Sequence, residues 1–143
     1  MKPSKCHCTN LRTAANRITR LYDEALEGTG LKVTQYRLLR LISIADRPSL
    51  SALESDTGLD RSTLGRNIRV MAKAGHVRIV HGEDARETLA EPTEQGLEVL
   101  EMARQRWDAC QKRVEDALGD DLHEKLQSIL HSLENISQDQ QER

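Results

Sequence analysis

Residues 49–93 read SLSALESDTGLDRSTLGRNIRVMAKAGHVRIVHGEDARETLAEPT, and the pattern of these residues is the strongest indication of the fold. Its first part predicts a short helix over residues 50–57 and a second helix over about 61–74, with Gly58 in the left-handed position that ends the first. Its second part predicts a β-hairpin, because Val and Ile are concentrated just before the turn-forming residues 82–85. The pattern therefore indicates two helices joined by a tight turn and followed by a hairpin.

The second of these helices has the features of a DNA-reading helix. Leu64, Ile68 and Met71 lie at helical spacing and predict its buried stripe, so Arg66 and Asn67 project outward. In the major groove, arginine can bond guanine, and asparagine adenine, through two hydrogen bonds. Five basic residues and no acidic one occur from Arg61, at the start of this helix, to Arg78 in the first predicted strand. The residues expected to contact DNA are Arg61, Ser62, Thr63, Arg66, Asn67, Arg69, Arg78, Asp84 and Arg86.

The start of this helix and the hairpin have separate expected roles. Ser62 and Thr63 are expected to contact phosphates, helped by the free N–H groups of the first helical turn. Arg86 is expected to enter the minor groove, whose negative potential attracts arginine. A carboxylate so close to DNA must be paired, so Asp84 is expected to pair with an arginine, such as Arg78 on the opposite strand.

Two further residues of the reading helix are informative. Asp60 or Ser62 is suited to cap its start. Gly65 lies in its interior, where glycine costs about 0.8–1 kcal/mol relative to alanine. A close approach of the backbone to DNA or to a neighbouring helix would explain this glycine.

The composition favours one mainly helical domain, or one domain with appended helices. The chain has 143 residues, no Phe, one Trp and two Tyr, so its core must be aliphatic, which suits helix packing. The net charge of -2 hides an asymmetry. Residues 1–46 contain eight Lys/Arg against four Asp/Glu, residues 47–93 seven against seven, and residues 94–143 six against twelve. A near-neutral average therefore does not argue against a nucleic-acid partner.

The chain shows no sign of membrane insertion or export. No apolar run approaches the roughly 20 residues of a membrane span. The polar start MKPSKCHCTN lacks the apolar stretch of a signal peptide. We therefore expect a cytoplasmic protein with no membrane partner, whose cysteines are reduced at rest.

Helices are expected on both sides of residues 49–93, the stretch that contains the predicted DNA-reading helix. Thr34 is suited to cap one of them, and Gly119 is expected to separate the last two. The terminal helices expose much apolar surface, and a second copy of the chain would bury it in a symmetric dimer. By the spacing of apolar residues, the flanking helices cover about residues 9–27, 34–45, 93–118 and 121–136.

Several short motifs occur together in the chain: Gly30-Leu31-x-x-Thr34-Gln35-Tyr36-x-Leu38-Leu39, Ser62-Thr63-x-x-Arg66, Ala74-Gly75-x-Val77-Arg78, Asp84-x-Arg86 and Thr93-x-x-Gly96. Together they resemble the MarR family of bacterial winged helix-turn-helix repressors, over about residues 11–133. The last two motifs are the most specific part of the resemblance.

The resemblance implies a mainly α fold, a winged helix-turn-helix whose N- and C-terminal helices form a dimerisation region. It also implies a homodimer that represses from a palindromic operator in double-stranded DNA and is released by a small-molecule ligand or by oxidation. The expected regions are an N-terminal segment and dimerisation helix (1–33), the winged helix-turn-helix (34–93) and the C-terminal dimerisation helices (94–143).

Three cysteines are the candidates for an oxidation signal. Cys6 or Cys8 of one subunit is expected to reach Cys110 of the other. A disulfide there would change the distance between the DNA-binding regions (residues 34–93) of the two subunits, here called the reading heads. Nearby basic residues favour the thiolate at the N-terminal cysteines. The alternative is that Cys110 is a small buried apolar residue and the N-terminal pair is idle. Metal binding at Cys6-His7-Cys8 would need further ligands, so no metal and no cofactor are expected.

A small acid bound between the dimerisation helices and the reading head is the other candidate signal that the resemblance implies. The candidate contacts are Arg17, Tyr36 and Arg40, although Tyr36 suits the core equally well.

An enzyme is not expected. The sequence has no Gly-rich phosphate loop, no Ser/His/Asp order and no paired-Cys zinc pattern. The alternative class is a protein–protein interaction module, built from the acidic terminal helices and without DNA binding. That alternative leaves the basic cluster unexplained, and salt-dependent binding to any duplex DNA separates the two.

Overall fold

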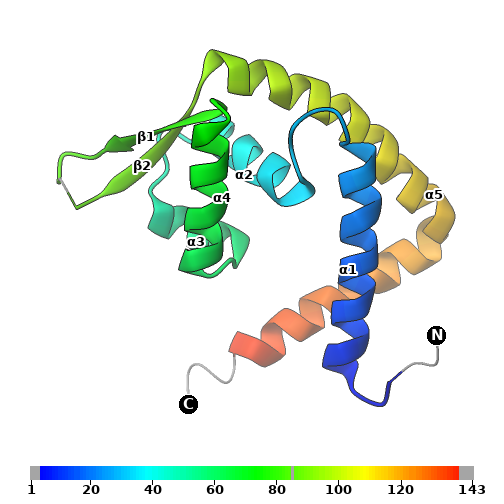
Figure 1. Cartoon of the computed structure of the whole chain (residues 1–143). Coiled ribbons are helices and arrows are strands. Elements are labelled where there is room, and N and C mark those ends of the chain that lie inside the picture. Colours follow the sequence, from blue (N-terminus) through cyan, green and yellow to red (C-terminus); the bar gives the residue numbers. More distant parts are fainter. Residues whose placement is uncertain (1–3, 85, 139–143) are drawn as a thin grey trace. The chain divides into compact units, whose positions relative to one another are not determined.

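The computed structural model describes residues 4–84 and 86–138. Helices dominate this part of the chain, and its sheet has two strands. Both features agree with the predicted mainly helical fold that contains one β-hairpin. One compact unit ends at Trp107 and a second begins at Asp108. In chain order the elements are α1 (His7–Ala25), α2 (Val33–Ile44), α3 (Leu50–Thr57), α4 (Arg61–Lys73), β1 (Val77–His81), β2 (Thr88–Pro92) and α5 (Glu94–Gln138) (Figure 1).

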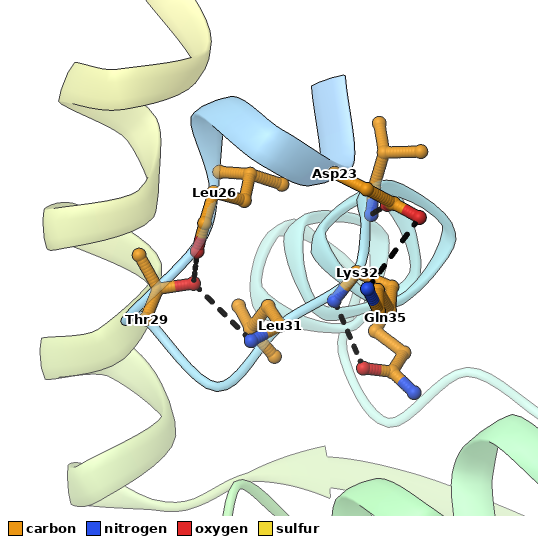
Figure 2. Close-up of polar contacts among 7 residues, drawn as sticks. Asp23, Leu26, Thr29, Leu31, Lys32 and Gln35 are labelled. Atoms are coloured by element: carbon orange, nitrogen blue, oxygen red, sulfur yellow. Dashed lines mark hydrogen bonds and ion pairs between the residues drawn. The ribbon is translucent and has the colours of Figure 1, made fainter. Parts of the chain in front are cut away.

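The start of α2 is fixed by a side chain from α1 (Figure 2). The Asp23 carboxylate accepts the backbone N–H of Val33 at 2.8 Å and lies 3.8 Å from the Lys32 ammonium. The Gln35 side chain accepts the backbone N–H of Lys32 at 3.1 Å. The predicted cap, Thr34, is wrong, because it lies inside the helix and α1 supplies the acceptor instead.

The connection between α1 and α2 is closed by a buried threonine (Figure 2). The Thr29 hydroxyl donates to the carbonyl of Leu26 at 2.8 Å and accepts the backbone N–H of Leu31 at 3.2 Å. Both leucines are buried, so this turn belongs to the core. The N-terminal helix begins at His7, two residues before its predicted start, with Cys6 at the N-cap.

The core is aliphatic, as predicted, and lies where α2 meets α3, α4 and β2. Its aromatic member is Tyr36, which stacks on the half-buried Trp107 with ring centroids 5.8 Å apart. Within the described residues, the core cluster consists of Leu26, Leu31, Tyr36, Leu38, Leu39, Ile42, Leu53, Leu64, Ile68, Met71, Val77, Ala90 and Ala103.

The two helices of the reading stretch form where the sequence predicted them. Gly58 ends α3 with a left-handed φ of 67°. The predicted stripe of Leu64, Ile68 and Met71 is buried, which leaves the opposite face of α4 toward solvent. Asp60, one of the two predicted caps, accepts the backbone N–H of Thr63 at the start of α4.

Strands β1 and β2 form an antiparallel hairpin beside α4 (Figure 1). The segment before α3 adds a short third edge, because Ser49 bridges Leu89 and the Pro48 carbonyl accepts the N–H of Ala90 at 3.1 Å. The hairpin is therefore attached to the start of α3. Of the predicted turn, Ala85 lies outside the described residues.

A compact joint connects the hairpin to α4 and α5. The Thr93 hydroxyl donates to the Gly75 carbonyl and accepts the N–H of Gly96 at 2.9 Å, while the Thr93 N–H bonds the His76 carbonyl at 3.1 Å. A Cβ on Gly96 would lie 2.0 Å from that His76 oxygen. The Thr93-x-x-Gly96 motif therefore caps α5 and allows its first turn to touch the backbone of His76, between α4 and β1.

Helix α5 is interrupted as predicted. Gly119 has a φ of 71° and a ψ of 166°, which no α-helix contains. Within residues 4–84 and 86–138, no helix is both long and apolar enough to cross a membrane. After the break, one stripe of α5 leaves its large apolar side chains exposed: Leu122, Leu126, Ile129, Leu130, Leu133 and Ile136.

Candidate nucleic-acid interface

The N-terminus of α4 is held by one carboxylate. Asp60 accepts the Ser62 hydroxyl at 2.6 Å, the Thr63 hydroxyl at 2.6 Å and the Thr63 N–H at 2.9 Å. The hydrogen bond from the Ser62 hydroxyl, followed by those from Thr63, holds the pKa of the Asp60 carboxyl well below its ordinary range. Both predicted phosphate-binding hydroxyls thus already donate to Asp60, and each must rotate away before it can donate to DNA.

The outward face of α4 presents the predicted base-reading residues. Arg66 is exposed, and its guanidinium has no hydrogen bond or ion pair within the described residues. Asn67 is half-buried, and one N–H of its amide donates to the Thr63 carbonyl at 3.0 Å, so its side-chain oxygen and its second N–H are left to face a base. Arg69 is also exposed.

Gly65 lies beside Arg69 on this face, and the structure removes one of its two explanations. A Cβ at Gly65 would meet only the Arg69 guanidinium, at an ordinary 3.6 Å, so no neighbouring helix requires the glycine. Its φ is also not left-handed. Close approach of the helix to DNA is the explanation that remains.

Asp84 has a different role from the predicted one. Its carboxylate accepts the backbone N–H of Arg86 at 3.0 Å, and its carbonyl accepts the N–H of Glu87 at 2.8 Å. Asp84 therefore holds the backbone of Arg86 and Glu87 at the start of the returning strand. The suggested pairing of Asp84 with Arg78 is wrong, because the strand register places Arg78 opposite Glu91.

Glu91 holds two arginines at the base of the hairpin. Its carboxylate lies 3.0 Å from an Arg78 guanidinium nitrogen and 3.1 Å from that of Arg47. The Glu91 side chain is 17% exposed, whereas those of the arginines are 66% and 63% exposed. Arg47 has a left-handed φ of 51°, which is uncommon for this residue type. Neither Glu91 nor Arg47 was among the predicted site residues, because the pairing of residues 78 and 91 depends on the strand register, which the sequence alone did not specify.

Two of the three predicted ligand-pocket residues meet at one cavity. A cavity of about 420 Å³ is lined by Tyr36, Arg40 and Trp107 among others. The Arg40 guanidinium carbon lies 6.0 Å from the centre of the Trp107 ring, within reach of a cation–π interaction. Arg17, on α1, is not among the lining residues, and Trp107 takes a place that the sequence analysis did not assign.

The three cysteines are free thiols in unlike surroundings. Cys6 and Cys8 are exposed, whereas Cys110 is buried. A hydrogen bond from the Thr9 side chain is the main cause that lowers the pKa of the Cys6 thiol. Within the described residues, no group of three or more His, Cys, Asp or Glu side chains is arranged to hold a metal ion.

Comparison with known proteins gave family and structural matches. A family model described as MarR family matches residues 29–87. The Mycobacterium tuberculosis transcriptional regulator MosR in complex with DNA is 33% identical, with 92% of this chain and 98% of that chain covered and a TM-score of 0.81. A further MosR crystal structure is 30% identical, with 98% of both chains covered and a TM-score of 0.78.

A third structure shows the same fold at lower identity. Bordetella bronchiseptica BpsR, whose DNA binding is regulated by 6-hydroxynicotinic acid, is 17% identical, with 94% of this chain and 96% of that chain covered and a TM-score of 0.81. The comparison with curated proteins gave no match.

Proposed function

We propose that this chain, which belongs to the MarR family of transcriptional regulators, acts as a homodimeric repressor on a palindromic operator. Members of this family are DNA-binding regulators and in general are not enzymes. The winged helix-turn-helix fold is therefore established for this chain, and its role as a repressor, its dimer and its release signal are proposals.

The observation that carries the proposal is the outward face of α4. This face follows a capped helix start, presents Arg66 and Asn67 beside a bare stretch of backbone at Gly65, and continues into a hairpin with Arg86 next to its turn. In a helix-turn-helix, residues near the start of the second helix face the bases of the major groove. We assign base reading to Arg66 and Asn67, and backbone positioning to the surrounding basic residues.

Exposed apolar surface supports the proposed dimer. Ile18 on α1 is 45% exposed, and Ile129 on the last part of α5 is 54% exposed, each within a stripe of similar residues. A second copy of the chain would remove such surface from water. A palindromic operator then matches the two-fold symmetry, with half-sites about 10 base pairs apart or a multiple of that.

Oxidation of cysteine is one proposed release signal. Cys6 is exposed, and its lowered pKa raises the fraction of reactive thiolate. Hydrogen peroxide would oxidise the Cys6 thiol to a sulfenic acid and release one water, and a second thiol would then displace a second water to form a disulfide. The proposed partner thiol is Cys110 of the partner subunit. Because Cys110 is buried within its own chain, its helix must open before the bond can form.

Binding of a small aromatic acid is the second proposed release signal. The cavity beside Trp107 offers an aromatic wall in Tyr36 and a cation in Arg40, which suit an aromatic carboxylate. BpsR, in which a small aromatic acid regulates DNA binding, shares the fold. A ligand there would lie against both α2 and the first part of α5.

One experiment tests the oxidation proposal. Affinity for the DNA upstream of the chain's own gene is measured by footprinting before and after mild peroxide, in the parent and in Cys6→Ser, Cys8→Ser and Cys110→Ser variants. We expect peroxide to lower the DNA affinity of the parent protein but not that of the variants that lack a reacting cysteine. Identical parent affinities before and after peroxide would dismiss oxidation as the signal.

A second experiment tests the dimer. Analytical ultracentrifugation at micromolar concentration is expected to give twice the mass of the chain. A stable monomer would contradict the proposal.

A further inference from the structure

A small cavity opens between α3, α4 and the hairpin. Its volume is about 200 Å³, and its walls include Ser51 of α3, Arg61 of α4, and Arg86 and Thr88 on the β2 side of the hairpin. The bridge between Ser49 and Leu89 holds the hairpin against the start of α3, so the walls come from elements that are joined directly.

Hydrogen-bond donors without partners gather at this cavity. Within the described residues, the hydroxyls of Ser51 and Thr88 have no hydrogen-bond partner. Ser49 caps α3 through the N–H of Ala52 at 3.1 Å, which leaves the N–H of Ser51 as a first-turn donor with no acceptor inside the helix. Unpartnered donors from α3 and β2 thus face one space.

The charge at the cavity is also unbalanced. Arg61 and Arg86 place two guanidinium groups at its wall, against the carboxylate of the exposed Glu87. Arg61 has an ion pair with Glu54, but the distance is a loose 3.9 Å and the arginine is 71% exposed. Two like charges around unpaired donors favour an anion between them, and guanidinium groups suit phosphate oxygens.

We propose that this cavity, the α3–hairpin cleft, binds one backbone phosphate of duplex DNA through Ser51, Arg61 and Thr88, with Arg86 adding its charge at the edge. The first helix of a helix-turn-helix crosses the DNA backbone, which places the start of α3 at a phosphate. The inference rests on the proposal that α4 reads DNA, and it adds Ser51 and Thr88 as positioning residues. A phosphate held there fixes the hairpin and α4 to the same point of the backbone.

The test combines small substitutions with a modified duplex. Thr88→Val and Ser51→Ala remove one hydroxyl each, Arg61→Gln removes one charge, and Ser55→Ala, an exposed serine of α3 outside the cleft, is the matched control. The DNA is a duplex that the parent selects from a random-sequence library. Each phosphate in turn is replaced by a neutral methylphosphonate, and affinities are read by fluorescence anisotropy.

We expect Thr88→Val, Ser51→Ala and Arg61→Gln each to bind roughly tenfold more weakly, while Ser55→Ala matches the parent. We also expect that neutralising one particular phosphate lowers the DNA affinity of the parent by a similar factor. On that modified duplex, the parent and all three variants should bind with equal affinity. The variants must keep the parent's thermal midpoint by circular dichroism.

Two results would overturn the inference. In the first, the parent binds duplex DNA but the three variants bind as tightly as it does. In the second, no single phosphate accounts for the three losses together. A parent that binds no duplex at any salt concentration would overturn both this inference and the proposed function, so the two failures are distinguishable.

Discussion

The Gly65→Ala substitution is expected to change the stability of the fold and the affinity for DNA in opposite directions. The residue lies inside α4 with a helical backbone, and an added methyl group would touch only the flexible Arg69 guanidinium, at 3.6 Å. Alanine is favoured over glycine in a helix interior by about 0.8–1 kcal/mol. We therefore expect the free energy of unfolding to rise by about that amount.

DNA binding is expected to change in the opposite direction. If the α4 backbone lies against the duplex at Gly65, the added methyl group overlaps with DNA atoms, and this overlap reduces the binding free energy by about 1–3 kcal/mol. That cost corresponds to a loss of roughly 5- to 150-fold in affinity. A more stable protein that binds its operator more weakly is not explained by damage to the fold.

The assay pairs urea denaturation with anisotropy titration of the selected duplex and of a random duplex at the same salt concentration. Gly65→Ala should raise the urea midpoint and weaken specific binding more than random binding. Equal affinity of variant and parent for the selected duplex, together with the raised midpoint, would refute the close approach of α4 at this face.

Three further changes test other parts of the structure. Gly96→Ala places a Cβ 2.0 Å from the His76 oxygen and should lower the free energy of unfolding by about 3 kcal/mol or more in a urea titration; an unchanged midpoint would contradict the α4–α5 joint. Burial lowers the pKa of His76, so its stabilising effect is complete above its ordinary pKa of about 6.5 and is lost as the pH falls below that value. Urea midpoints at pH 7.5 and 5.5 should therefore differ in the parent and differ less in His76→Gln. Glu91→Gln frees Arg47 and Arg78 and should cost less than about 1 kcal/mol of stability. It should also tighten binding to random duplex and steepen its salt dependence by about one unit, and an unchanged salt slope would show that neither arginine reaches DNA.

Local patterns in the sequence were enough to predict the reading head. The buried stripe of α4 follows from helical spacing alone, and Gly58 marked the end of α3 because a left-handed residue is needed there. Asp60 was predictable for the same reason, since a cap acts on the next three residues of the chain.

Contacts between distant residues were not predictable in this way. The cap of α2 comes from Asp23 on another helix, so the local choice of Thr34 failed. The pairing of Arg78 with Glu91 depends on the register of the hairpin, which one residue of shift would change. The cavity beside Trp107 needs the packing of α2 against the first part of α5, and no spacing within either segment encodes it.

Sequence-specific binding by α4 is expected to depend on Arg66. The most direct measurement is the ratio of affinities for the selected and the random duplex, at one fixed salt concentration, in the parent and in Arg66→Ala. The parent ratio should be on the order of a thousand or more, and Arg66→Ala should lower it by about 5- to 150-fold, because a bidentate contact contributes about 1–3 kcal/mol of discrimination. An unchanged ratio in Arg66→Ala would contradict the assignment of base reading to this face of α4.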